Sequence, residues 1–353
     1  MILTYKYRIK DRSAKKTLRR HAYAVNQVWN YCCAQQLDVQ ARYRAGEKPR
    51  KWATHYDLQK LCKGVSKILN LNQQSVGEVC RQFAVARDKI KRAPNFRSSF
   101  GAKRSLGWIP FQNQGRQIEG NTITYFRKRY RFWEGGRPLP ENAKGGYFVE
   151  DSLGRWYVCF HVEVEQRIGG DAAIGIDLGL KSFVTLSDGR RIGAPQYYRQ
   201  YEQRIAKSQR ANNQRKSRRL WIKIQNCRQD FLHKLSTELA ARYSLIVVGN
   251  VNAKQLAQTR MAKSVLDASW STFRTMLKYK SVGYEEVNES FTTVTCSACG
   301  ARSGPKGQKG LRIREWICDE CGAVHDRDHN SAKNILARSA AGPVEGSRGR
   351  VAQ

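Results

Sequence analysis

In the first half of the chain, the spacing of hydrophobic and polar residues changes twice. The N-terminal stretch "MILTYKYRI" alternates apolar and polar residues, which predicts a half-buried strand. From Ser13 to Arg92 apolar residues lie three or four positions apart, as at Val25, Trp29 and Cys32, which predicts helices. From Ser105 to Glu165 short strand patterns return between glycines, as in "NTITYF" and "RYRFWEG". We therefore expect a small β-barrel or sheet that the N-terminal strand joins, with the helices inserted into it.

From Asp171 onward, buried strands alternate with helical patterns. The stretches "AAIGIDLGL", "SLIVVGN" and "GYEEVNESF" read as strands, and "SFVTLSDGRRIGA" reads as a hairpin. Between them, Gln196–Ala241 and "SWSTFRTMLKYKS" have helical spacing. The second half is therefore predicted to be an α/β domain. The Gly-rich, charged tail "AGPVEGSRGRVAQ" is expected to be disordered.

The net charge of the chain favours one class of binding partner. Lys and Arg number 64 against 29 Asp and Glu in 353 residues, a formal net charge of +35. Such an excess favours a polyanion, and the default polyanion is nucleic acid. A membrane surface is disfavoured, because no apolar run approaches the roughly 20 residues of a spanning helix and the N-terminus lacks a signal peptide. A generically basic protein remains the alternative, although the excess is spread over the whole chain.

One helical stretch concentrates this charge. Ten Lys and Arg lie between Arg199 and Arg228, against the single acid Glu202. A solvated face explains any one of these residues, but as a set we expect them to contact phosphates. The densest part comprises Lys207, Arg210, Arg215, Lys216, Arg218 and Arg219.

The ten cysteines fall into two groups. Four form two Cys-x2-Cys pairs separated by eighteen residues, a spacing typical of a tetrahedral structural zinc site with no open position for catalysis. A redox role is the alternative for the pairs. The predicted zinc ligands are Cys296, Cys299, Cys318 and Cys321. The remaining cysteines have no framework spacing and are expected to be reduced, partly buried apolar residues: Cys32, Cys33, Cys62, Cys80, Cys159 and Cys227.

Two acidic motifs suggest a second metal site. Asp177 lies in the buried strand "IGIDLGL", and an acid there is costly unless it binds metal or is hydrogen-bonded. Both actin-like ATPases and ribonuclease-H-like nucleases begin with such a strand. Asp326 and Asp328 lie in "HDRDHNSAKNIL", directly after the last cysteine pair, where N-capping explains only one of them. No later glycine-rich phosphate loop follows, and the charge also disfavours an ATPase.

The order of these motifs resembles the TnpB family, the RNA-guided nucleases of bacterial transposons that are related to compact type V CRISPR effectors. The resemblance rests on "GIDLG", the basic helices, "WSTFRTMLKYK", "TTVTCSACG", "CDECG" and "HDRDHNSAKNIL". It covers Asp171 to Leu336, and "YKYRI" and "VNQVWNYCCAQQL" near the start are similar more weakly. It implies a β-barrel wedge domain with an inserted helical recognition domain, and then a RuvC-like nuclease domain interrupted by a zinc ribbon.

The fold class implied is α+β and multidomain, with a ribonuclease-H-like (RuvC) α/β domain in the second half. The expected boundaries are 1–12 and 105–168 for the wedge, 13–104 for the helical domain, 169–291 and 326–340 for the nuclease domain, 292–325 for the ribbon and 341–353 for the disordered tail.

By this resemblance Asp177 matches the first catalytic carboxylate and Asp328 the last, with Asp326 as the alternative. The reaction implied is phosphodiester hydrolysis by two Mg2+ ions about 3.5–4 Å apart, which takes about three carboxylates. The family's middle Glu is expected at the end of "SLIVVGN", where this chain has Gly249 followed by Asn250.

A neighbouring strand offers a replacement acid. Parallel strands lie about 4.8 Å apart, and active sites of open α/β sheets lie at the carboxyl ends of strands. The strand "GYEEVNESF" ends near Glu289, whereas Glu285 lies four residues back and Glu286 has the opposite parity. Glu289 is therefore the predicted third ligand, and a solvated Glu at a strand edge is the alternative.

Together these features predict an active RNA-guided DNA endonuclease that cuts next to a short flanking motif, with Asp177, Glu289 and Asp328 as Mg2+ ligands. Guide RNA and target DNA are the expected partners of a monomer in the bacterial cytoplasm, at the nucleoid, with no membrane partner. The alternatives are a nuclease-dead guided DNA-binding protein, acting as a repressor, and a plain RNA-binding protein. The presence of both aspartates favours the active enzyme.

Overall fold

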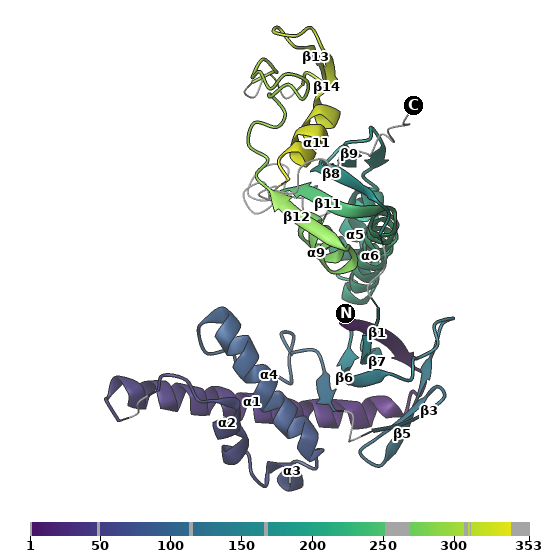
Figure 1. The fold of residues 1–353 in the computed structure, drawn as a ribbon. Coiled ribbons are helices and arrows are strands. Elements are labelled where there is room, and N and C mark those ends of the chain that lie inside the picture. The colour runs from purple at the N-terminus through teal and green to yellow at the C-terminus, as the bar shows by residue number, and fades with distance from the viewer. Residues whose placement is uncertain are drawn as a thin grey trace, which may run out of the picture. The chain divides into compact units, whose positions relative to one another are not determined.

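The structure is a computed structural model that describes residues 2–47, 50–112, 116–165, 169–250, 269–306, 310 and 312–339. It divides into two compact units, Met1–Val164 and Glu165–Gln353, which are described separately (Figure 1). The predicted tail at 341–353 lies outside the described residues. No helix in the described part is long and apolar enough to cross a membrane.

The first unit contains a curled antiparallel sheet of seven strands in the order β2-β6-β7-β1-β5-β4-β3. The N-terminal strand joins this sheet as predicted, because β1 pairs with β7 along almost its whole length. The strands are β1 (Ile2–Ile9), β2 (Trp108–Phe111), β3 (Arg116–Glu119), β4 (Thr122–Tyr125), β5 (Lys128–Trp133), β6 (Ala143–Glu150) and β7 (Trp156–Glu163).

Four helices lie between β1 and β2 in the sequence: α1 (Ala14–Arg44), α2 (His55–Leu61), α3 (Val65–Ile68) and α4 (Gln73–Ile90). Sequence signals set their ends: Thr54 and Asp57 form a capping box at α2, and the Asn72 side chain caps α4. One hydrophobic cluster contains both helix residues, such as Leu18 and Phe83, and sheet residues, such as Phe132 and Phe148. The inserted helices and the sheet therefore share one core.

The second unit contains a five-stranded sheet in the order β10-β9-β8-β11-β12. The central strands β8, β11 and β12 are parallel, whereas β9 and β10 form the antiparallel hairpin predicted from the sequence. The strands are β8 (Ala172–Leu178), β9 (Ser182–Leu186), β10 (Arg191–Gly193), β11 (Tyr243–Gly249) and β12 (Gly283–Val287). The fold class α+β is thus confirmed for the described residues.

The predicted helical stretch 196–241 is divided into two helices, α5 (Tyr197–Arg210) and α6 (Gln214–Arg242). Asn212 adopts a left-handed φ of 48° between them, and the Asn213 side chain accepts from the Lys216 N–H to cap α6. Asparagine suits both positions, because it tolerates the left-handed region and its side chain caps helices. The result is an antiparallel helical hairpin.

The described residues of this unit contain two further helices, α9 (Trp270–Lys280) and α11 (Arg327–Ala337). A short hairpin of β13 (Glu315–Ile317) and β14 (Val324–Asp326) leads directly into α11. Helix α11 lies against β8, where a Cβ on Gly175 would come within 2.2 Å of the Ala332 carbonyl oxygen. The absence of a side chain at Gly175 and the small Ala332 therefore allow the helix to lie close to the sheet.

Candidate functional site

Strand register brings the predicted acid positions to one edge of the second sheet. Ile176 of β8 pairs with Val248 of β11, and Gly249 pairs with Val287 of β12. Asp177, the next residue of β8, therefore lies level with Gly249 on the neighbouring strand β11, whereas Glu289 lies two residues beyond the end of β12. All three positions lie at the carboxyl ends of parallel strands, where the ligand sites of open α/β sheets are found.

The Glu289 side chain lies in the space that a side chain at residue 249 would enter. A Cβ built on Gly249 would lie 3.0 Å from Glu289 Oε2, 3.3 Å from Glu289 Cβ and 3.1 Å from Ile335 Cδ1. Asn250 holds the backbone beside it, because its Oδ1 accepts from the Glu289 N–H at 3.3 Å. The Asn250 side chain thus positions the segment that carries Glu289.

The pKa of the Asp177 carboxyl is raised by burial and by two acidic neighbours. Burial raises the pKa of this half-buried carboxyl, and the charges of Asp328 and Glu289 raise it further, to about 7. A hydrogen bond from the Ser331 hydroxyl at 2.9 Å and the charge of Arg327 oppose the rise. Burial also raises the pKa of Glu289, against the charge of Arg274. Carboxyls whose pKa values are shifted by burial and by neighbouring charges are typical of functional sites.

Helix α11 distinguishes its two aspartates. Asp326 caps the helix by accepting from the His329 N–H at 2.9 Å and pairs with Arg191 at 2.5 Å. Burial works to raise the pKa of Asp326, but these contacts hold it below its ordinary value. Asp328 lies in the first turn of the helix, where its charge raises the pKa of Asp177, and its carboxylate contacts Arg314 Nη1 at 3.3 Å. Asp326 therefore has a capping role, and Asp328 faces the acidic site.

The other acids of β12 have partners of their own. Glu286 pairs with Arg274 at 3.2 Å and accepts from the Tyr284 hydroxyl, and Glu285 accepts from Ser339 at 2.8 Å. The oxygens of Asp177, Glu289 and Asp328 are not all within 4.8 Å of one another, although the charges of Glu289 and Asp328 both act on the Asp177 carboxyl.

The sequence did not predict the hydroxyl and amide contacts that link α11 to the segment after β12. The Ser331 hydroxyl lies 2.9 Å from the Thr292 hydroxyl, so the residue that bonds Asp177 also contacts the segment following Glu289. The Asn330 and Asn334 side chains each donate to the Thr292 and Thr295 carbonyl oxygens, at 2.6–3.1 Å. The only sequence signal for these contacts is polar residues on a helix face that would otherwise be apolar.

The four cysteines of the two Cys-x2-Cys pairs come together. Their sulfurs all lie within 4.8 Å of one another, with Cys296–Cys321 at 3.7 Å and Cys299–Cys318 at 3.6 Å. Each pair lies in the same tight turn, in which the N–H of Gly300 or Gly322 donates at 2.9 Å to the carbonyl of the first cysteine. Both glycines have positive φ, 81° and 70°. Four converging thiols in two matching turns fit a tetrahedral metal ion.

The six predicted nucleic-acid residues all lie on the α5–α6 hairpin and are exposed: Lys207, Arg210, Arg215, Lys216, Arg218 and Arg219. An aromatic pair lies on the same two helices, because Tyr198 stacks on Trp221 at 5.6 Å and Trp221 is 44% exposed. Cations beside exposed aromatic rings suit a chain of phosphates and bases.

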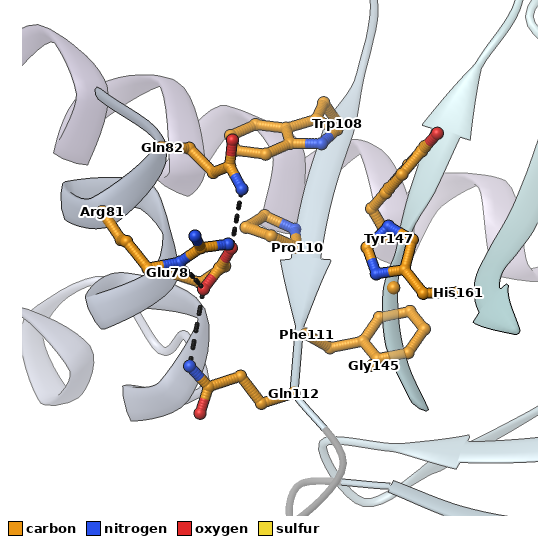
Figure 2. Close-up of a pocket in the computed structure, with 11 residues that line it drawn as sticks. Glu78, Arg81, Gln82, Trp108, Pro110, Phe111, Gln112, Gly145, Tyr147 and His161 are labelled. Carbon is orange, nitrogen blue, oxygen red and sulfur yellow. Dashed lines mark hydrogen bonds and ion pairs between the residues drawn. The ribbon is translucent and has the colours of Figure 1, made fainter. Parts of the chain in front are cut away.

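The first unit has a pocket that sequence spacing could not reveal, because its residues come from α4, β2, β6 and β7 (Figure 2). Its volume is about 590 Å³, and Trp108, Tyr147 and His161 contribute aromatic rings to its lining. Glu78 accepts hydrogen bonds from Arg81 at 2.8 Å, Gln82 at 2.9 Å and Gln112 at 3.4 Å (Figure 2). Burial works to raise the pKa of Glu78, but these donors hold it below its ordinary value.

Comparisons with known proteins agree with the sequence motifs. Residues 157–260 match the family model "Probable transposase" (OrfB_IS605), and residues 270–335 match "Cas12f1-like, TNB domain". A putative RNA-guided DNA endonuclease of Streptomyces pristinaespiralis is 38% identical over 57% of this chain and 54% of its own length. The putative RNA-guided DNA endonuclease InsQ of Escherichia coli is 27% identical over 66% of this chain and 60% of its own length.

The match therefore spans about half to three fifths of the length of these relatives. Among solved structures, a Cas12f1 complex with guide RNA and target DNA aligns with 95% of this chain and 98% of its own, at 14% identity and a TM-score of 0.36. The family models and the named relatives confirm the resemblance of this chain to the TnpB family.

Proposed function

We propose that this chain, which resembles the TnpB family, is an RNA-guided DNA endonuclease with Asp177, Glu289 and Asp328 as its catalytic carboxylates. The observation that carries the proposal is the position of Glu289, whose carboxylate oxygen lies 3.0 Å from the place of a Cβ at residue 249. A glutamate from the segment that follows β12 thus fills the space that the strand-end glutamate of the family would occupy. The two named relatives are putative RNA-guided DNA endonucleases, which supports the same activity.

The three carboxylates fit a pair of Mg2+ ions by charge and by chemistry. Mg2+ prefers oxygen ligands, and when bound the ions would activate the attacking water and stabilise the leaving oxygen of a phosphodiester. Burial raises the pKa values of Asp177 and Glu289, and a bound cation would favour the ionised form of both carboxyls. Ser331 orients Asp177 through its hydrogen bond, and Asn250 positions the backbone of Glu289.

The remaining parts of the chain support guided targeting. We propose the domain boundaries expected from the sequence, with a wedge domain at 1–12 and 105–168, a helical domain at 13–104 and a RuvC-like domain at 169–291 and 326–340. In this proposal the four cysteines hold a structural Zn2+ that stabilises the ribbon at 292–325. The exposed cations of the α5–α6 hairpin contact the guide RNA or its hybrid with the target strand, and the protein acts as a monomer.

The pocket beside α4 is the proposed reader of the flanking motif. An ionised carboxylate only accepts hydrogen bonds, so Glu78 orients the NH2 groups of Gln82 and Gln112 toward itself. Their amide oxygens then become the acceptors presented to a ligand. A pocket with such acceptors and the Trp108 and Tyr147 rings suits a base edge that carries an amino group. Glu78 would set this preference without touching the DNA.

The test is to purify the protein with its co-expressed RNA and to add Mg2+ and a DNA library with randomised flanking sequence. Cleavage restricted to targets that match the guide, next to one flanking motif, is the expected result. Guided binding without cleavage at any Mg2+ concentration would overturn the endonuclease and leave the nuclease-dead DNA-binding protein, which Gly249 favours. RNA binding without target recognition would overturn both.

A further inference from the structure

Three cysteine sulfurs meet in the core of the first unit. Cys80 Sγ lies 3.9 Å from Cys32 Sγ and 3.8 Å from Cys62 Sγ, and all three sulfurs lie within 4.8 Å of one another. The three residues come from different elements: Cys32 from α1, Cys62 from the C-cap of α2 and Cys80 from α4. Their exposed fractions are 0%, 1% and 0%. The cluster is separate from the four-cysteine ribbon, which belongs to the other unit.

The spacing of these sulfurs fits a bound ion and does not fit a disulfide. A disulfide requires an S–S distance of about 2.05 Å, far below the observed separations. Three thiolates about 2.3 Å from a central ion lie roughly 3.8–4 Å apart in tetrahedral or trigonal geometry. The paired sulfurs of the ribbon, at 3.6 and 3.7 Å, have nearly the same spacing. Packing of three thiols as small apolar groups is the competing explanation.

We propose that Cys32, Cys62 and Cys80 form a second metal site, specific for a thiophilic ion and independent of the proposed nuclease activity. Thiolate ligands select soft or borderline ions such as Zn2+, Cd2+ and Cu+ and reject Mg2+ and Ca2+. Three thiolates around a divalent ion leave one net negative charge, whereas around a monovalent ion they leave two. A buried charge is unfavourable, so the site favours a divalent ion over Cu+.

Binding would release up to three protons, because each thiol that ligates the ion must first be deprotonated. The ion would then tie together α1, α2 and α4. Helix α4 carries Cys80 toward this cluster and Glu78 and Gln82 toward the pocket, so the metal would fix the helix that presents the pocket residues. The cluster would be a structural staple of the helical segment, with no open coordination position required.

The experiment counts metal ions per chain in the full-length protein, loaded with excess Zn2+ under reducing conditions, washed and analysed by mass spectrometry of the elements. The wild type is expected to retain two Zn2+ per chain, one in each cluster, and Cys80→Ala is expected to retain one. The matched control is Cys33→Ala, since Cys33 is equally buried on α1 but its sulfur donates to the Pro94 carbonyl at 3.4 Å instead. This control should retain two.

One Zn2+ per chain in the wild type, or no difference between Cys80→Ala and Cys33→Ala, would overturn the proposal in favour of simple packing. If Cys80→Ala does not fold, cadmium NMR of the loaded wild type gives the answer. Separate three-sulfur and four-sulfur signals support the second site, and a four-sulfur signal alone refutes it. Neither readout depends on guided cleavage, so failure here leaves the proposed function intact.

Discussion

Moving the third carboxylate from residue 289 back to residue 249 is expected to restore the cleavage that its removal abolishes. In Glu289→Ala the site loses one of three carboxylates that neutralise the metal ions. A loss of several kcal/mol of transition-state stabilisation corresponds to a roughly thousandfold slower reaction. Guide RNA and target binding should stay unchanged, because Glu289 lies outside the basic helices.

The reverse substitution alone should bring no gain. In Gly249→Glu the new Cβ would lie 3.0 Å from Glu289 Oε2 and 3.1 Å from Ile335 Cδ1, so both side chains compete for one space. Such overpacking costs about 1–3 kcal/mol. In the double variant the Glu289 side chain is gone, the space is open, and a glutamate at 249 can reach Asp177. We expect the double variant to recover at least part of the thousandfold loss.

The assay is single-turnover cleavage of a guide-matched DNA in Mg2+, with binding measured in parallel for all four proteins of this cycle. Glu286→Ala is the control, since Glu286 lies three residues before Glu289, on β12, but pairs with Arg274. Full activity of Glu289→Ala would refute the assignment of Glu289. A large gain from Gly249→Glu alone would show that the natural site lacks its third acid.

Three further predictions concern protonation, zinc and base recognition. The pKa of Asp177 is raised to about 7 from an ordinary value of 3.8, so protons compete with metal for this carboxylate below neutral pH. The Mg2+ concentration for half-maximal cleavage should therefore be roughly tenfold higher at pH 6 than at pH 8. A Mg2+ requirement that does not change with pH would contradict this prediction. Cys299→Ser should release zinc and lower the melting temperature by roughly 5 °C or more, because 1 kcal/mol is worth about 2–4 °C in a unit of this size, whereas Cys227→Ser outside the ribbon should not. Glu78→Gln should weaken discrimination at one flanking base by about 1–3 kcal/mol in the library assay, while Glu163→Gln, an exposed partner of Lys144, should leave the motif unchanged.

The periodicity of apolar residues was sufficient to predict most helices and strands of the fold, because the apolar patterns of the core elements are strong. Strand β11 contains the continuous apolar run at residues 245–248, and its parallel pairing with β8 and β12 follows from the α/β order. The break between α5 and α6 was missed because Asn212 and Asn213 interrupt a helical pattern without a Gly or Pro. A polar residue can continue a helix or end it, and only the left-handed φ of Asn212 decides.

The candidate sites differ in how well the spacing of residues in the sequence predicts them. The ribbon cysteines could be predicted, since two local turns dictate the ligand geometry. The remaining cysteines are free and buried or half-buried, as predicted, but the sequence did not predict that Cys32, Cys62 and Cys80 meet, because they are distant in sequence and share no motif. The pocket around Glu78 was missed for the same reason, because His161 and Gln112 reach it only through the pairing of sheet strands. Such clusters depend on tertiary packing, which sequence spacing does not encode.

Helix α11 connects the two predicted metal sites of the second unit. Its Asn330 and Asn334 side chains hold the segment between Glu289 and the first ribbon cysteine, and Asn330 Oδ1 accepts from the Ser297 N–H at 2.8 Å inside the first cysteine turn. The same helix carries Asp328 and the serine that bonds Asp177. Burial raises the pKa of Asp177 most, and the charges of Asp328 and Glu289 add to the rise, so holding these acids together has an electrostatic cost. If the proposed function holds, the attachment of the ribbon to α11 would therefore also help to hold Asp328 and the serine that bonds Asp177 in place for Mg2+.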